Sequence, residues 1–246
     1  MESEPQQVEV KVWDVPTRVF HWAIFVLLVV QLVTGYYGGE WMRWHFASGY
    51  AVLTLVVYRV IWGFVGSTHA RFASFIAGPA ATLRFARRLF SKQAVPQVGH
   101  NPLGGWNVIV LIVALVLQTV SGLFSNDGAG NEGPLAAFVS LDVSTKLSEF
   151  HDWNLKALLI LSGLHIAAVL FHWIVKKDNL VPSMFTGRKL VPAAALRERR
   201  DAMRKSPRRR SASREHASAY FARPLRSVVV LAVSIVLVYI ATRGWR

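Results

Sequence analysis

The sequence of 246 residues contains no cysteine. Disulfide bonds, thiolate metal sites, cysteine-ligated iron–sulfur clusters and covalently attached heme are therefore excluded. Any redox centre must use histidine or another ligand without a thiol. The first ten residues, MESEPQQVEV, also lack the basic region and the small-residue cleavage site of a signal peptide. We therefore expect the first apolar segment to remain in the mature protein.

Charged residues are scarce in five long apolar segments, which span residues 19–37, 45–65, 106–124, 155–175 and 228–241. Four approach the roughly 20 residues that a membrane-spanning helix needs, and the fifth reaches that length only with its flanks. The sequence thus predicts an all-α membrane protein, a four-transmembrane-helix bundle plus one additional C-terminal transmembrane helix. The predicted parts are a cytoplasmic lead-in (1–18), the four-helix domain (19–190), a basic cytoplasmic linker (191–226) and an anchor helix (227–246).

The formal net charge of +14 is distributed unevenly along the chain. Residues 176–226 hold 15 Lys/Arg and four Asp/Glu, and residues 66–105 hold five Lys/Arg and no acid, whereas residues 125–150 hold four acids and one lysine. Basic loops stay on the cytoplasmic side of bacterial membranes. We therefore expect a multi-pass protein of the bacterial inner membrane with a cytoplasmic N-terminus and a periplasmic C-terminus. Membrane lipid is the expected partner of the basic residues, and nucleic acid is not.

Three histidines lie on one face of the fourth apolar segment and its N-terminal extension. His151, His165 and His172 are spaced by 14 and 7 residues, which brings them to one stripe of a helix at about 100° per residue. The rise from His151 to His165 is about 21 Å at 1.5 Å per residue. His21 and His45 lie near the starts of two earlier apolar segments. This arrangement predicts two stacked hemes held between helices, because intramembrane ionisable residues are functional candidates.

The alternating topology predicts which histidines share a depth. His45 and His151 both lie near the outer surface, whereas His21 lies near the inner surface with His165 or His172. Arg59 follows His45 by 14 residues, so it belongs to the same helix face about 21 Å further in. It is a candidate partner for a heme propionate, and snorkelling to the inner interface is the equal alternative.

Two further residues receive provisional roles. Gly49 lies one turn after His45, where a missing side chain lets a flat macrocycle approach the backbone, although packing alone also explains a glycine there. His100, in the glycine-rich loop GHNPLGG, is expected to be solvated, with proton transfer at a quinone site as the alternative.

Three sequence segments together resemble the bacterial cytochrome b561 family. They are TRVFHW before the first span, HFASGY at the second, and LHIAAVLFHWIVKKDNLVPSM in the fourth. The family is related to the di-heme cytochrome b subunits of nickel–iron hydrogenase and formate dehydrogenase, and the likeness covers about residues 13–190. The resemblance implies two non-covalent hemes b with axial pairs His21–His165 and His45–His151. It places His172 near a heme propionate or a quinone.

The expected function is electron transfer across the membrane between the quinone pool and a partner redox protein. That partner is a periplasmic cytochrome c or the redox subunit of a dehydrogenase or hydrogenase, and oligomer formation is compatible with the sequence. The chain is expected to be an electron-transfer oxidoreductase subunit, not a hydrolase or transferase. The alternative is a histidine-dependent transporter or metal-ion channel without heme.

Overall fold

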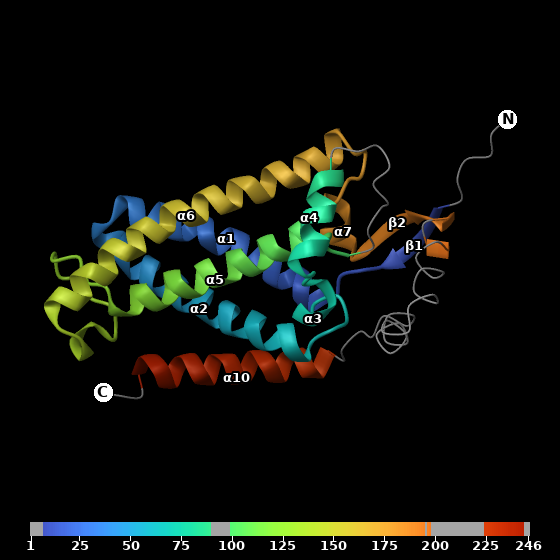
Figure 1. Ribbon diagram of the computed structural model, residues 1–246. Coiled ribbons are helices and arrows are strands. Elements are labelled where there is room, and N and C mark those ends of the chain that lie inside the picture. Colours follow the sequence, from blue (N-terminus) through green and yellow to red (C-terminus); the bar gives the residue numbers. More distant parts are fainter. Residues whose placement is uncertain (1–6, 90–98, 195, 198–223, 244–246) are drawn as a thin grey trace. The chain divides into compact units, whose positions relative to one another are not determined.

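The computed structural model describes residues 7–89, 99–194, 196–197 and 224–243, in which five helices are long and apolar enough to cross a membrane. These helices are α1 (Val15–Tyr37), α2 (Met42–Val65), α5 (Pro102–Phe124), α6 (Leu141–Ile174) and α10 (Pro224–Arg243). The short helices are η1 (Gly39–Trp41), α3 (Phe72–Phe75), α4 (Pro79–Arg88), η2 (Ala136–Phe138) and α7 (Val181–Thr186). The predicted all-α membrane fold is therefore confirmed, with the addition of one small sheet (Figure 1).

The boundaries of two spans differ from the apolar segments. Helix α6 begins at Leu141, well before the apolar segment at 155–175, so His151 lies inside the helix and not at its start. Helix α10 has 20 residues because polar flanks extend its apolar segment, as a membrane span requires. The predicted basic linker lies largely outside the described residues, which resume at Pro224.

The chain divides into two compact units. The first contains Met1–Arg18, Trp62–Asn107 and His165–Arg223, and the second contains Val19–Ile61, Val108–Leu164 and Pro224–Arg246. Helices α2, α5 and α6 contribute residues to both units.

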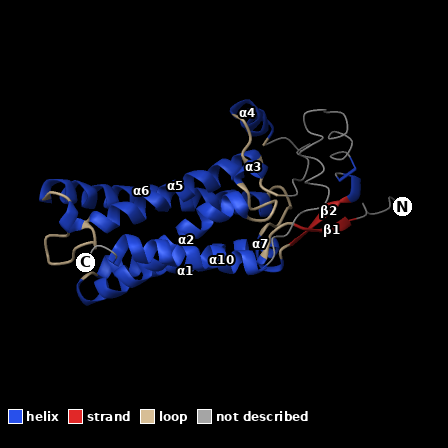
Figure 2. Ribbon diagram, turned by 90° about the horizontal axis from the view of Figure 1, so that it is seen from below, coloured by secondary structure: helices blue, strands red, loops and turns tan. Residues whose placement is uncertain are grey.

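The second unit is a helical bundle with an apolar core. Its buried core residues come from α1, α2, α5 and α6 and are Ile24, Val52, Val56, Ala114, Leu115 and Leu158. Figures 1 and 2 show α10 running alongside α2 in this unit. One face of α10 is buried at every fourth residue, at Val230, Ser234, Val238 and Thr242, while its other large apolar side chains are exposed. Such a distribution suits a helix with one face on protein and the others on lipid.

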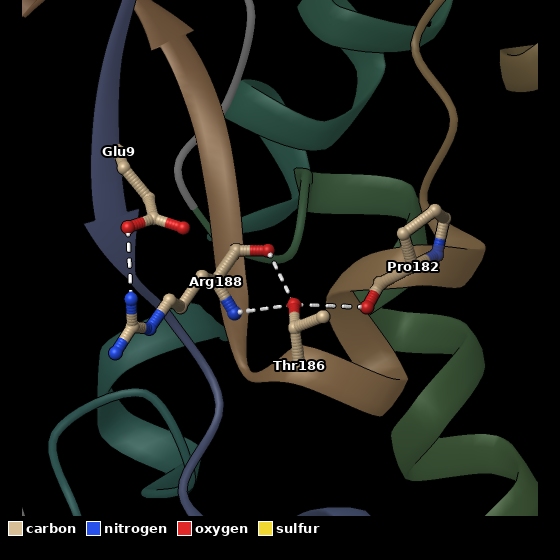
Figure 3. Close-up of polar contacts among 4 residues, drawn as sticks. All are labelled: Glu9, Pro182, Thr186 and Arg188. Carbon is tan, nitrogen blue, oxygen red and sulfur yellow. Dashed lines mark hydrogen bonds and ion pairs between the residues drawn. The ribbon is translucent and has the colours of Figure 1, made fainter.

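The first unit contains a two-stranded antiparallel sheet that the sequence did not predict. Strand β1 (Gln7–Lys11) pairs with β2 (Arg188–Pro192), with Glu9 opposite Leu190. Figure 3 shows the ion pair between Glu9 and Arg188, 3.0 Å long, and the Thr186 hydroxyl, which accepts from the Arg188 N–H. Both strands are short; β1 is mostly exposed, whereas β2 contains the fully buried Val191. The lead-in is thus partly ordered against the segment that follows the fourth span.

A buried carboxylate begins α1. Asp14 is the residue before the helix, and its Oδ1 accepts the Thr17 N–H at 2.9 Å, which satisfies one of the unpaired donors of the first turn. Its Oδ2 accepts the indole N–H of the fully buried Trp62 at 3.2 Å. Pro16 lies in the first turn, as expected from its missing N–H. Asp14 therefore fixes both the start of α1 and the end of α2.

We expect Asp14→Ala to lower the stability of the protein by about 2–3 kcal/mol, because it removes both a helix cap and the carboxylate that accepts the buried Trp62 N–H. The measurement is the thermal unfolding midpoint in detergent. Glu9→Gln is the matched control, since its ion pair is about half exposed and contributes about 0–1 kcal/mol. Equal midpoints for the two variants would contradict the role given to Asp14.

Candidate functional site

Two of the candidate ligands meet in the second unit. His45 on α2 and His151 on α6 are half-buried, and their ring centroids are 6.4 Å apart with an interplanar angle of 72°. An imidazole nitrogen binds a transition metal at about 2.0–2.1 Å. With about 1.1 Å from nitrogen to ring centre, imidazoles on opposite sides of one metal ion have centroids about 6.3 Å apart. The separation therefore fits one iron between the two rings.

The hydrogen bonds of these rings select the form that binds a metal. Nδ1 of His151 lies 2.9 Å from the carbonyl oxygen of Gln118, which can only accept, so Nδ1 carries the proton. Nδ1 of His45 lies 3.3 Å from Oγ1 of Thr34, whose own hydroxyl donates to the Val30 carbonyl at 2.7 Å. The Thr34 oxygen therefore accepts from His45. In both rings the unprotonated nitrogen is Nε2, which is the ligand form of neutral histidine.

Each ring also packs against a glycine of a neighbouring helix. A Cβ at Gly35 of α1 would lie 3.2 Å from Cε1 of His45, and one at Gly122 of α5 would lie 2.9 Å from Cε1 of His151. Contacts this short leave no room for a side chain at Gly122 unless the ring moves. The two glycines thus let the histidine-bearing helices approach closely, and they set where each ring lies.

The surroundings of the two histidines come from a repeated sequence pattern. QLVTG at 31–35 and QTVSG at 118–122 share Gln, Val, a hydroxyl residue and Gly at equivalent positions. Gln31 donates to Oγ of Ser48 at 2.7 Å, and Oε1 of Gln118 accepts from Asn154 at 2.6 Å. Ser48 and Asn154 each follow their histidine by three residues. The repeat is a signal in the sequence that marks the surroundings of both histidines.

Two other candidate residues belong to the second unit, one on α1 and one on α2. His21 is half-buried on α1, and Arg59 is buried on α2 with 3% of its surface exposed. The burial of Arg59 on the helix face that carries His45 is compatible with a guanidinium that pairs with a heme propionate. It does not require the side chain to snorkel to the membrane interface. The pairing of Arg59 with a propionate stays a prediction.

His165 and His172 belong to the first unit, and each contacts an asparagine of α5. Nδ1 of His165 lies 3.1 Å from Nδ2 of Asn107, and Nε2 of His172 lies 3.3 Å from Nδ2 of Asn101. The sequence analysis did not single out either asparagine. Because His21 lies in the second unit, the choice of its partner stays a prediction from the sequence.

The expectation of a solvated His100 is wrong. Its ring is half-buried between two aromatic residues of the first unit, with centroids 4.7 Å from both Trp13 and Phe75. The reason is that Trp13, at the end of the lead-in, packs beside the loop that carries His100.

The chain belongs to the prokaryotic cytochrome b561 family, whose model matches residues 12–187. It is 24% identical over 226 residues to a probable Ni/Fe-hydrogenase B-type cytochrome subunit of Rhizobium leguminosarum bv. viciae, covering 77% of this chain and 92% of the relative. It is 25% identical to the same kind of subunit from Rhodobacter capsulatus, with coverages of 77% and 84%. No solved structure matches the chain at a significant level.

Family membership supplies the class of the site. A cytochrome b uses heme b to transfer electrons, so the chain is a heme b electron-transfer protein with several membrane spans. The fit of the His45 and His151 rings to one iron agrees with that class.

We expect Gly122→Ala to lower bound heme per polypeptide and to destabilise the protein by about 1–3 kcal/mol, because the new methyl group overlaps the His151 ring. Gly35→Ala should have a smaller effect in the same direction, since its contact is longer. Gly163→Ala is the matched control, because nothing lies within 4 Å of a Cβ there. Heme absorbance and thermal unfolding are the measurements, and a Gly163→Ala loss equal to that of Gly122→Ala would contradict the packing argument.

Proposed function

We propose that the protein is a di-heme cytochrome b that carries electrons across the bacterial inner membrane between the quinone pool and a partner redox protein. The observation that carries this proposal is the His45–His151 pair, whose 6.4 Å ring separation and fixed Nδ1 contacts suit two axial ligands of one iron. Bound heme supplies reversible one-electron chemistry. The chain's own residues hold, orient and shield it.

In this proposal His45 and His151 are the axial ligands of the outer heme. Thr34 and the Gln118 carbonyl keep the proton on Nδ1 of each ring, so both rings present an unprotonated Nε2. Gly35 and Gly122 allow the rings to lie close to α1 and α5.

His21 and His165 are the proposed axial ligands of the inner heme. The proposal rests on the helical spacing and on the resemblance to the family. The asparagine contacts favour His165, because Asn107 engages its Nδ1, whereas Asn101 engages Nε2 of His172, the nitrogen that a ligand would present to iron. Arg59 is the proposed partner of a propionate, because it is buried 14 residues after His45 on the same face of α2 and a guanidinium pairs well with a carboxylate.

A quinone is the proposed exchange partner at the cytoplasmic side. His172 and Asn101 lie together in the first unit, and the ion pair between Asp178 and Lys189, 2.7 Å long, follows directly after α6. The Asp178 N–H donates to the His172 carbonyl, which ties this pair to the end of the helix. Histidine and amide side chains supply the hydrogen bonds that quinone oxygens need, and histidine can transfer protons at neutral pH.

The proposed partner is the redox subunit of a hydrogenase or dehydrogenase, or a periplasmic cytochrome c. Relatives across most of the chain bear the name Ni/Fe-hydrogenase B-type cytochrome subunit, which favours a hydrogenase. Basic loops predict a cytoplasmic N-terminus, so the His45–His151 pair faces the periplasmic partner.

The test of ligation is the heme content of single histidine variants. We expect two hemes per polypeptide by pyridine hemochrome assay in the unchanged protein. His45→Ala and His151→Ala should each lose the outer heme and retain the inner one. His21→Ala and His165→Ala should each lose the inner heme and retain the outer one. His69→Ala is the control and should retain both. Full heme content in His45→Ala or His151→Ala would refute the outer pair, and a heme lost from His172→Ala but not from His165→Ala would reassign the inner ligand.

A separate test addresses the quinone site. We expect His172→Gln to keep both hemes and their spectra while the rate of heme reduction by a quinol analogue falls about tenfold or more, as for loss of a proton-transfer group. Stopped-flow absorbance in detergent or proteoliposomes measures that rate. Unchanged quinol kinetics, with dithionite reduction also unchanged, would exclude His172 from the quinone site.

A further inference from the structure

Helix α5 carries a polar partner for each of the two α6 histidines proposed as ligands. Ser121 lies beside His151, with Oγ 3.2 Å from Nδ1, and Asn107 lies beside His165, with Nδ2 3.1 Å from Nδ1. Each contact is made within one unit. The two partners are 14 residues apart on α5, which is also the spacing of the two histidines on α6.

The equal spacing follows from the way that α5 and α6 pair. The partner nearer the C-terminus of α5 contacts the histidine nearer the N-terminus of α6, so the helices run antiparallel in register. Asn154 holds that register between the two contacts, because its amide donates to the Ala114 carbonyl at 2.9 Å and to Gln118 at 2.6 Å. A buried amide bonded to both backbone and side chain resists sliding of one helix along the other.

We propose that α5 is a positioning helix whose Asn107 and Ser121 set the redox potentials of the inner and outer hemes separately. The inference rests on the proposed ligation by His165 and His151. An acceptor at Nδ1–H makes an imidazole a stronger electron donor, and this stabilises the oxidised iron and lowers the potential. In the structure Nδ2 of Asn107 faces Nδ1 of His165. Around an iron-bound His165, Nδ1 carries the proton, so the Asn107 amide turns by roughly 180° about its Cβ–Cγ bond and presents Oδ1 to that ring.

The two positions are unequal in a way that makes the inference testable. His151 has a second acceptor, the Gln118 carbonyl at 2.9 Å, which remains when Ser121 is changed. For His165, the Nδ1 contact is the Asn107 amide at 3.1 Å. Removal of the Ser121 hydroxyl leaves the Gln118 carbonyl at Nδ1 of His151, so it should shift the potential of the outer heme less than removal of the Asn107 amide shifts that of the inner heme.

The experiment is a spectroelectrochemical redox titration of the full-length protein in detergent. We expect Asn107→Leu to raise the potential of the inner heme by up to about 59 mV, a tenfold change in the oxidised-to-reduced ratio of a one-electron couple, and to leave the outer heme unchanged. Ser121→Ala should raise only the potential of the outer heme, and by less than Asn107→Leu raises that of the inner heme. The inner component is identified as the one that remains in the His45→Ala background.

Two further variants separate positioning from general damage. Asn107→Asp keeps an acceptor oxygen and should hold the inner potential at or below its original value. Thr119→Ala is the control, because this α5 hydroxyl bonds to the Leu115 and Val116 carbonyls of its own helix, and it should shift neither heme. The same inner shift in Asn107→Leu and Asn107→Asp would overturn the inference, as would equal shifts of both hemes in Asn107→Leu.

Failure of the inference differs from failure of the proposed function. If the histidine variants lose heme as expected but the Asn107 and Ser121 variants retain the original potentials, the ligation stands and the positioning role is wrong. If His165→Ala and His151→Ala retain both hemes, the ligation itself is wrong.

Discussion

A buried imidazole has two nitrogens, and the hydrocarbon of a membrane offers a partner to neither. The protein therefore provides polar partners for the rings, and Nδ1 is the nitrogen that they contact at His45, His151 and His165. These three histidines lie on α2 and α6, whereas the hydroxyl, carbonyl and amide groups that contact them lie on α1 and α5. The arrangement leaves Nε2 of His45 and His151 for the proposed iron.

The same requirement explains the positions of two glycines. A ring can reach a hydroxyl of the next helix only if the backbones approach closely, and Gly35 and Gly122 follow Thr34 and Ser121 directly. The core of the second unit is apolar and consists of Ile24, Val52, Val56, Ala114, Leu115 and Leu158. Polar groups thus surround the His45 and His151 rings, and close-packed aliphatic side chains fill the core.

Local patterns in the sequence predicted the helices and the histidine stripe, because hydropathy and the 3.6-residue period are properties of single segments. They did not predict the pairing of β1 with β2, since the two strands are distant in the chain and RKLVP of β2 shows no alternation, although QVEVK of β1 does. Gly49 was the glycine singled out for close approach, yet a Cβ there makes only an ordinary 3.5 Å contact with Gln31. The tight positions, Gly35 and Gly122, depend on the register between helices. In the sequence, the repeated Gln-x-Val-hydroxyl-Gly pattern is the feature that distinguishes these two glycines.

The register between α5 and α6 has a consequence for electron transfer under the proposed function. His151 and His165 lie on one helix, so their separation along it, about 21 Å at 1.5 Å per residue, is fixed by the hydrogen-bonded helix and not by a flexible loop. The polar partners on α5 repeat the same spacing. A substitution at one partner position then alters the electronic environment of one ligand without moving the other. An antiparallel helix pair of this kind lets the two redox centres acquire different potentials while their distance stays constant.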